Sequence, residues 1–396
     1  MEKYKSKRLS SLGSAIFSDM AQWKEEVRRR GVDVIDLGIG SPDRPPSERV
    51  IKAMEQAVRQ PHVYGYPTSE GSPAFRAAVA KWYQHRFSVT LDPANEIVTL
   101  MGSQDGLAHL AMAITDPGDV VMVPDPGYPI YGASLVLAGV TPYFVPLREE
   151  NGYLPNLADI PEQTAREAKF ILLNYPSNPL STVASKSFFE QLIAYANKYD
   201  LLVVHDLAYS EMAFDGCRPM SILEVAGAKD VAVEFHSMSK SFNMAGCRLA
   251  FMVGQPEVVK ALRVLKSNID YGVFLAVQEA GIAALEEDME QGQSVAALYQ
   301  RRRDVVIDGL AAAGWIIPKP KATMFIWACI PHGWTSRQIS REILYETGVV
   351  VIPGDAFGEE GEGYIRIALV QEEERLREAV SRIAGFLRSH GKSTSA

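Results

Sequence analysis

The stretch Ser237-Met238-Ser239-Lys240-Ser241-Phe242-Asn243-Met244-Ala245-Gly246-Cys247-Arg248 decides how the rest of the chain is interpreted. It holds a lysine among small and hydroxylated residues, with an arginine eight positions later. This pattern predicts that the Lys240 amine lies in a partly enclosed site beside a group that binds anions. A lysine amine held in this way forms a Schiff base with a carbonyl compound. A solvated surface lysine is the alternative, so the choice depends on other parts of the chain.

The same stretch predicts what the carbonyl compound is. Ser237, Ser239 and Arg248 supply hydroxyl and guanidinium donors that suit a phosphate group. A Schiff-base lysine next to a phosphate site is typical of enzymes that use pyridoxal 5'-phosphate (PLP). The stretch therefore predicts one cofactor, PLP, bound covalently at Lys240.

Composition excludes several other classes of protein. The chain has 396 residues, a formal net charge of -8 and a pI near 5.5, so we expect no nucleic-acid partner. We find no apolar run of membrane-spanning length and no signal-peptide core after the basic N-terminus. The cysteines, Cys217, Cys247 and Cys329, lack the spacing of a disulfide scaffold or a zinc site, and the histidines do not cluster. We expect a cytoplasmic protein without a metal.

The middle of the chain alternates short apolar runs with amphipathic stretches. Strands are predicted at 96–100, 120–123, 170–173, 201–204, 231–235 and 249–253, and helices at 104–114, 185–198 and 256–267. This alternation predicts an α/β fold with a mainly parallel central sheet flanked by helices. Ligands bind beyond the carboxyl ends of the strands in such sheets.

The pattern changes after about residue 285. A long helix is predicted over 294–313, followed by strands at 323–328, 349–353 and 363–368 and a terminal helix over 372–388. These elements predict a second, smaller α+β domain. We assign 45–285 to the large cofactor-binding domain, and 1–44 with 286–396 to the small domain.

Asp206 and Tyr209 follow directly after a predicted strand, within Leu202-Val203-Val204-His205-Asp206-Leu207-Ala208-Tyr209. A carboxylate at that strand end would keep a pyridinium nitrogen protonated, which makes the ring a better electron sink. Tyr209 would hydrogen-bond the phenolic oxygen of the cofactor. The alternative is that Asp206 caps a turn or a helix.

Three further segments fit the same cofactor. Asn178, in an Asn-Pro turn, would contact the phenolic oxygen and a substrate carboxylate, although such turns are common. Ser103 and Gln104 lie between a strand and a helix, where free backbone N–H groups suit a phosphate. Tyr128, in a proline-rich turn, would stack on the cofactor ring or would simply pack in the core.

Arg366 lies inside an apolar strand, where a guanidinium is costly unless it is paired. A carboxylate is its natural bidentate partner, and an amino-acid substrate supplies one. The alternative is a structural ion pair with Glu360 or Glu362.

Together these motifs resemble the class I/II aminotransferases of PLP fold type I, over nearly the whole chain and in the same order. The resemblance implies that Gly40, in Leu37-Gly38-Ile39-Gly40-Ser41-Pro42-Asp43, lies at the substrate carboxylate. It implies that Tyr66 reaches the phosphate in the partner subunit's site, and hence a homodimer with active sites at the interface. We expect side-chain selectivity to depend on loops that include Ala15-Ile16-Phe17 and the partner's 268–274 segment, in which Tyr271 would line the neighbouring site.

Two positions depart from the usual family pattern. The chain has Asn178-Pro179-Leu180-Ser181 where the family has N-P-T-G, and Cys247 where it has tryptophan. The loss of glycine changes the backbone freedom of that turn. The segments 127–131 and 150–155 resemble most the diaminopimelate/alanine-type branch.

The resemblance implies an aminotransferase that moves an amino group between an L-amino acid and a 2-oxo acid. It would work by a ping-pong mechanism through a Schiff base at Lys240, with Asp206 and Tyr209 also catalytic. A C–S β-lyase on the same fold is the alternative within enzymes. A non-catalytic regulatory protein is a third interpretation, which the complete set of site residues disfavours.

Overall fold

The computed structural model describes residues 4, 6–10, 12, 15–291 and 295–390. Its largest sheet has seven strands in the order β2-β8-β7-β6-β5-β3-β4. The strands are β2 (Ile97–Leu100), β3 (Val120–Asp125), β4 (Thr141–Pro146), β5 (Ala168–Asn174), β6 (Leu202–Asp206), β7 (Ala232–Ser237) and β8 (Ala250–Gly254). Only β8 runs against its neighbours, and the pairs from β7 to β4 are all parallel. The predicted α/β fold with a mainly parallel sheet is confirmed.

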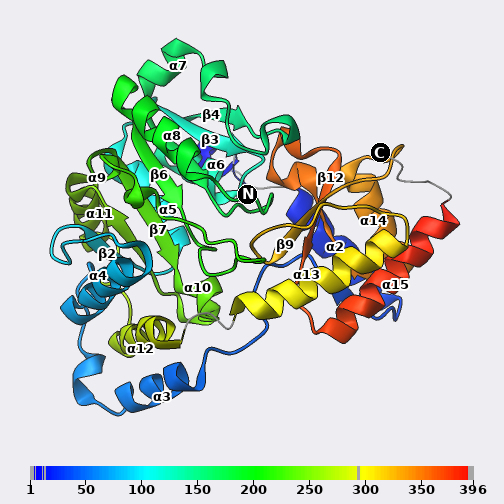
Figure 1. Cartoon of the computed structure of the whole chain (residues 1–396), viewed down its shortest axis with the longest axis horizontal. Helices are drawn as coiled ribbons and strands as arrows, with labels where there is room; N and C mark the ends of the chain where they lie inside the picture. Colours follow the sequence, from blue (N-terminus) through cyan, green and yellow to red (C-terminus); the bar gives the residue numbers. More distant parts are fainter. Residues whose placement is uncertain (1–3, 5, 11, 13–14, 292–294, 391–396) are drawn as a thin grey trace.

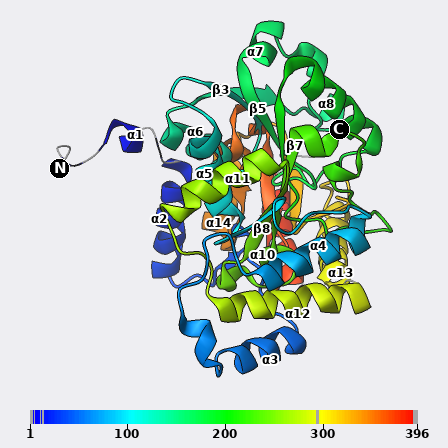
Figure 2. The same cartoon turned by 90° about the vertical axis from the view of Figure 1, so that its left-hand side faces the viewer.

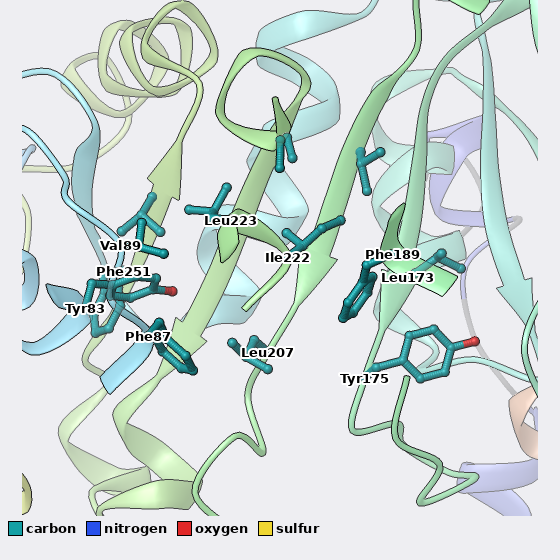
Figure 3. Close-up of a cluster of buried hydrophobic side chains, with 14 of the residues drawn as sticks. Tyr83, Phe87, Val89, Leu173, Tyr175, Phe189, Leu207, Ile222, Leu223 and Phe251 are labelled. Atoms are coloured by element: carbon teal, nitrogen blue, oxygen red, sulfur yellow. The ribbon is translucent and has the colours of Figure 1, made fainter. Parts of the chain in front are cut away.

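Helices cover both faces of this sheet, because successive residues of each buried strand point to opposite sides. Leu172 packs with one set of helices and Ile171 with the other. The first set is α5 (Ser103–Ile114), α6 (Ile130–Ala138) and α11 (Pro256–Ser267); the second is α4 (Pro73–Phe87), α8 (Lys186–Tyr199) and α12 (Leu275–Gln291). Figure 3 shows part of the hydrophobic core between the sheet and the second set of helices, where Leu173 of β5 and Phe251 of β8 point into the same layer.

The C-terminal third forms its own sheets and core. Figure 1 shows these elements on the right, beside the larger sheet. Strands β11 (Ile352–Pro353), β12 (Tyr364–Ala368) and β9 (Phe325–Cys329) form an antiparallel sheet, and β1 (Ile35–Asp36) pairs in parallel with β10 (Val349–Val350). Helices α2 (Ala15–Arg29), α13 (Val295–Ala312), α14 (Ser336–Thr347) and α15 (Glu373–Ser389) surround them. The domain boundaries assigned above stay a prediction.

The remaining helices are short or peripheral. Both views place α3 (Glu48–Ala57) beside α12 (Figures 1 and 2). The others are α1 (Lys7–Ser10), α7 (Glu162–Glu167), α9 (Ala228–Val231) and α10 (Met238–Ser241). Single 3-10 turns lie at Pro61–Tyr64, Glu149–Asn151, Leu157–Asp159, Ile222–Glu224, Ala245–Cys247, Gly354–Phe357 and Glu359–Gly361. Within the described ranges, no helix combines the length and apolarity needed to span a bilayer.

Two features of the sheets differ from the sequence-based expectation. Strand β4 was not predicted, because Pro142 and Pro146 argue against a central strand. It is an edge strand, where a proline without an N–H is tolerated. The strand expected at 349–353 is two strands in different sheets, because the chain changes hydrogen-bonding partners around Val351.

Candidate functional site

Side chains from three neighbouring parallel strands meet at one edge of the large sheet. Asp206 is the last residue of β6, Ser237 is the last of β7, and Asn178 follows β5. Parallel strands end at the same edge, so these residues surround one cavity of about 370 Å³. A volume in this range accommodates a small ligand.

The cavity collects nearly all the residues that the sequence singled out. Its lining includes Gly40, Ser103, Gln104, Tyr128, Asn178, Asp206, Tyr209, Ser237, Ser239, Lys240, Arg248 and Arg366. Tyr66 is the exception, since it does not line the cavity of its own chain and its side chain is 87% exposed. Its ring lies 4.8 Å from that of Tyr271, measured between centroids.

Lys240 lies on α10, the single helical turn that begins directly after β7. Its Nζ donates a hydrogen bond to the carbonyl of Gly40. Burial and the nearby guanidinium groups of Arg366 and Arg248 lower the pKa of Lys240 to about 8. The amine is therefore available in its neutral form near physiological pH, as a nucleophile or a base requires.

A cradle of donors lies beside Lys240. Arg248 donates from Nη1 to the carbonyl of Ala245 at 2.9 Å and contacts Ser239 Oγ at 3.4 Å. Gly102, just before α5, has φ +86°, and a Cβ there would lie 2.2 Å from Arg248 Nη2. Glycine is required because the guanidinium lies directly against the backbone at the start of α5. The free N–H groups of that helix and Arg248 thus face the same space, which suits an anion.

Asp206 is buried at the end of its strand and has two partners. Tyr131 donates its hydroxyl hydrogen to Oδ2 at 2.8 Å, and the Ala208 N–H contacts Oδ1 at 3.3 Å. Burial raises the pKa of Asp206, and the hydrogen bond from Tyr131 opposes that shift. Asn174 anchors the strand end by donating to the Asp206 carbonyl at 2.7 Å. The turn contact that was the alternative explanation of Asp206 exists, but it occupies only one carboxylate oxygen.

Arg366 is 6% exposed and has no carboxylate partner among the described residues. Its guanidinium donates to Asn178 Oδ1 at 2.8 Å and to the Gly38 carbonyl at 2.6 Å, and Nε has no partner there. The guanidinium carbon lies 4.2 Å from the ring centre of Phe325. Burial lowers the pKa of Arg366 to about 10.

The alternative ion pair of Arg366 is wrong. Glu360 pairs with Arg148 instead, at 2.6 Å, and Glu362 accepts a hydrogen bond from the Ser336 N–H. Arg366 is thus a buried cation that faces a cavity with only neutral oxygens as partners in the described structure. An anionic ligand is the partner that this arrangement lacks.

Tyr209 and Tyr128 both line this cavity. Burial raises the pKa of each phenol, so both hydroxyls stay protonated and can donate hydrogen bonds. Tyr128 donates to Gln104 Oε1 at 3.3 Å, which links the proline-rich turn to the start of α5.

Several lining residues were missed by the sequence analysis. Tyr131 was not singled out, and its place three residues after Tyr128, in the first turn of α6, was the available signal. Asn174 ends a strand in the same way as Asp206. No local pattern marks the apolar residues Ile39, Ile352 and Phe357, which come from three distant segments. Phe17, from the segment that we expect to affect selectivity, also lines the cavity.

Comparison with known proteins identifies the relatives of this chain. The family model described as aminotransferase class I and II matches residues 32–383. The LL-diaminopimelate aminotransferase of Desulforudis audaxviator is 48% identical over 387 residues, covering 98% of this chain and 99% of that protein. The enzyme of the same name from Moorella thermoacetica is 47% identical over 381 residues, covering 96% and 98%.

Solved structures share the fold. Substrate-bound BacF from Bacillus subtilis superposes with a TM-score of 0.93 at 35% identity, covering 99% of both chains. A probable N-succinyldiaminopimelate aminotransferase from Thermus thermophilus gives 0.88 at 38% identity, covering 93% of this chain and 99% of the other. The similarity extends over both sheets and over every segment that lines the cavity.

Proposed function

The chain belongs to the class I and II aminotransferases and is a PLP-dependent aminotransferase, and on this premise we propose the roles of its residues and its amino-acid substrate. One observation carries the assignment of roles. Lys240 and Arg366 are cations at one cavity beside Asp206, and no described carboxylate pairs with either of them. The cofactor would supply a covalent partner for Lys240, and the α-carboxylate of a substrate would supply an anionic partner for Arg366.

The residues fit PLP. Arg248, Ser237, Ser239, Ser103 and the start of α5 would hold the phosphate, and the absence of a Cβ at Gly102 lets the Arg248 guanidinium lie against the start of α5. The Asp206 carboxylate would hold the ring N–H, Tyr128 would pack against the ring, and Tyr209 and Asn178 would donate hydrogen bonds to its oxygen. When bound, PLP supplies an aldehyde carbon that takes the amino group and a ring that withdraws electrons from the substrate Cα.

The protein's own groups then bind the substrate and move one proton. Arg366 binds the substrate carboxylate bidentately, and the Gly40 segment closes over it. The Lys240 amine, whose pKa is lowered to about 8 in this structure, would take the proton from the substrate Cα and return it one carbon away. Tyr131 orients Asp206 and opposes the rise in its pKa that burial causes, because its hydroxyl donates to the carboxylate.

We propose LL-diaminopimelate as the amino donor and a 2-oxo acid as the acceptor. Support comes from relatives of that name, which are 43–48% identical over 95–98% of this chain. The apolar wall of Phe17, Ile39 and Phe357 would pack against the methylene chain of this substrate.

A visible absorption titration tests this proposal. The purified protein is mixed in turn with LL-diaminopimelate, L-glutamate, L-phenylalanine and L-cystathionine. We expect the yellow band of the bound cofactor to bleach with LL-diaminopimelate and to return when 2-oxoglutarate is added. A band that responds only to L-phenylalanine contradicts the substrate. Pyruvate formed from L-cystathionine without an acceptor contradicts the proposed course of the reaction.

We also propose a homodimer in which Tyr66 completes the partner subunit's site. The exposed aromatic side chains Tyr64, Tyr66, Tyr271 and Phe274 lie together outside the cavity, and such a patch favours association.

Mixed dimers of two inactive variants test the placement of Tyr66. A subunit with Tyr66→Phe keeps Lys240, and a subunit with Lys240→Ala keeps Tyr66. If Tyr66 acts in the partner's site, unfolding and refolding the two together creates one intact site per mixed dimer and restores activity. If Tyr66 acts in its own subunit, mixing restores none.

The proposed location is the cytoplasm. The three cysteines are free in the described structure and lie at separate places in the fold. A chain that relies on no disulfide is compatible with a reducing compartment.

A further inference from the structure

Ser181 has a backbone conformation that favours glycine. Its φ is +57°, in the left-handed region, and its side chain is 3% exposed. The class I/II pattern has glycine at this position, so a serine here keeps the same turn while adding a buried hydroxyl. A buried hydroxyl that replaces glycine needs hydrogen-bond partners, and both of them lie in the C-terminal part of the chain.

The Ser181 hydroxyl takes part in a closed chain of hydrogen bonds. Its Oγ donates to the carbonyl of Phe325 at 2.8 Å and lies 2.7 Å from Thr323 Oγ1. A hydroxyl has one hydrogen, so the Thr323 hydroxyl is the donor between the two side chains. Thr323 Oγ1 in turn accepts from the Phe325 N–H at 3.1 Å. Both hydroxyls are therefore satisfied, and both main-chain groups of Phe325 are bound.

These main-chain groups have no strand to bind among the described residues. Strand β9 is the edge of its sheet, and Phe325 lies opposite Ala368 of β12. The adjacent residues Met324 and Leu369 form the hydrogen-bonded pair, so the N–H and carbonyl of Phe325 point away from β12. Ser181 and Thr323 replace the missing neighbouring strand at this single residue.

Phe325 in turn lies against the carboxylate-binding groups. Its ring centre is 4.2 Å from the Arg366 guanidinium carbon and 5.9 Å from the ring centre of Tyr209. A Cβ at Gly40 would lie 2.4 Å from the same ring, so the ring also sets the position of that segment. Asn178, in the same turn as Ser181, binds Arg366 directly. The turn 178–181 thus reaches Arg366 by two separate routes.

We propose that Ser181 is a positioning residue for substrate binding, which acts through Thr323 and the Phe325 ring to hold the Arg366 guanidinium in place. It touches neither the cofactor site nor the substrate cavity. The proposal rests on the proposed role of Arg366 as the carboxylate-binding group. It assigns a function to the departure from the glycine of the family pattern.

The Ser181→Gly variant is the sharpest test, because glycine adopts the same φ without strain and removes only the hydroxymethyl group. We expect KM for the amino acid and for the 2-oxo acid to rise about five- to tenfold, the size of one lost buried hydrogen bond. We expect kcat to stay within about twofold, since Lys240 and Asp206 are untouched. The absorption band and the retention of the cofactor stay unchanged.

Variants at Thr323 supply the matched controls. Thr323→Ser keeps the hydroxyl and should behave as the unmodified protein, whereas Thr323→Val removes it and should raise KM as Ser181→Gly does. In the double variant the KM increase should match that of one single variant, because the chain of hydrogen bonds is broken only once. Independent, multiplying effects would contradict the proposed chain.

A binding measurement separates this proposal from the choice of substrate. Succinate, a dicarboxylate without an amino group, is titrated against the absorption band of the bound cofactor, which needs no turnover. We expect a roughly five- to tenfold higher Kd in Ser181→Gly, about the factor expected for KM. Unchanged KM and Kd overturn the proposal. A lower melting temperature with unchanged Kd also overturns it, since the role would then be structural. Failure of LL-diaminopimelate as a substrate leaves this readout intact.

Discussion

The buried cations of this protein divide between two regions. Away from the cavity, the fully buried ones in the described structure have carboxylate partners. Lys266 donates to Asp105 at 2.8 Å and to Asp270 at 2.9 Å. Arg302 binds Asp43 with two hydrogen bonds of 2.7 and 2.6 Å.

At the cavity, Lys240 and Arg366 donate to neutral oxygens instead of carboxylates. These oxygens belong to Gly40, Gly38 and Asn178. The pKa values of the cavity cations and of Arg302 shift in opposite directions, as the difference in partners predicts. Burial lowers the pKa of both cavity cations, whereas for Arg302 the hydrogen bonds that it donates to Asp43 outweigh burial and raise its pKa. This contrast agrees with the proposal that the two cavity cations bind ligands, whereas the paired cations neutralise partly buried carboxylates of the fold.

The largest effect is expected from Lys240→Ala. The substitution removes the nucleophile and the base together, so kcat/KM should fall at least about ten-thousandfold. Amino-group transfer to 2-oxoglutarate, followed as glutamate formed, measures it. Borohydride reduction followed by peptide mass spectrometry should find the cofactor on Lys240 in the unmodified protein. Near-normal turnover in the variant would refute the assignment.

Arg366→Met should lower kcat/KM about a thousandfold, because it removes the cation proposed to bind the carboxylate of the substrate. Stability should hold or rise, since no protein carboxylate in the described structure is left without a partner. The matched control is Arg302→Met, which leaves Asp43 without its cation. There we expect a loss of about 2 kcal/mol in the free energy of unfolding, with KM nearly unchanged. Similar behaviour of the two variants would remove the distinction between the two regions.

Lys266→Met should cost about 4 kcal/mol of stability, because two partly buried carboxylates lose their shared cation. Asp105 also accepts from the Met101 N–H at 3.0 Å, so cofactor retention should weaken as the start of α5 loosens. Urea unfolding and the rate of cofactor loss on dialysis measure the two effects.

In the cofactor-free protein, Lys240→Met should raise the free energy of unfolding, whereas Lys266→Met lowers it. The folded-state pKa of Lys240 is lowered from 10.5 to about 8, so holding its proton destabilises the fold at pH values below about 8. The unfolded chain binds more protons between those two values, so the unmodified protein gains stability as pH rises through that window. The substitution should therefore stabilise by about 3 kcal/mol at pH 7, and this gain should vanish above pH 10.5. Equal gains at both pH values would contradict the lowered pKa.

The smallest effect is expected from Glu360→Gln. This acid pairs with the exposed Arg148, and exposed ion pairs contribute little to stability because solvent screens them. KM should stay within about twofold of the unmodified value. A KM increase that approaches the effect of Arg366→Met would place Glu360 at the cavity instead.

Local sequence patterns predicted most strands of the fold and most residues that line the cavity. The apolar runs marked six of the seven strands of the large sheet, because burial on both faces leaves a signature in a few consecutive residues. Strand β4 was not predicted because its prolines argue against a strand. The prolines are tolerated because β4 lies at the edge of the sheet. Ser237 and Asp206 were found because each stands where an apolar run ends, which is a property of the local sequence.

The sequence by itself thus determined the parallel sheet and the order of its elements, and it predicted that Lys240, Asp206 and Arg248 serve one site; all three line one cavity. Tertiary structure alone decided which buried cations are paired: Arg302 found Asp43, whereas Arg366 found no acid among the described residues although Glu360 is near in sequence. It also decided that Ser181 binds Phe325, 144 residues away. The physical reason is range. Periodicity and chain direction are properties of neighbouring residues, but side-chain pairing depends on how distant segments pack against one another.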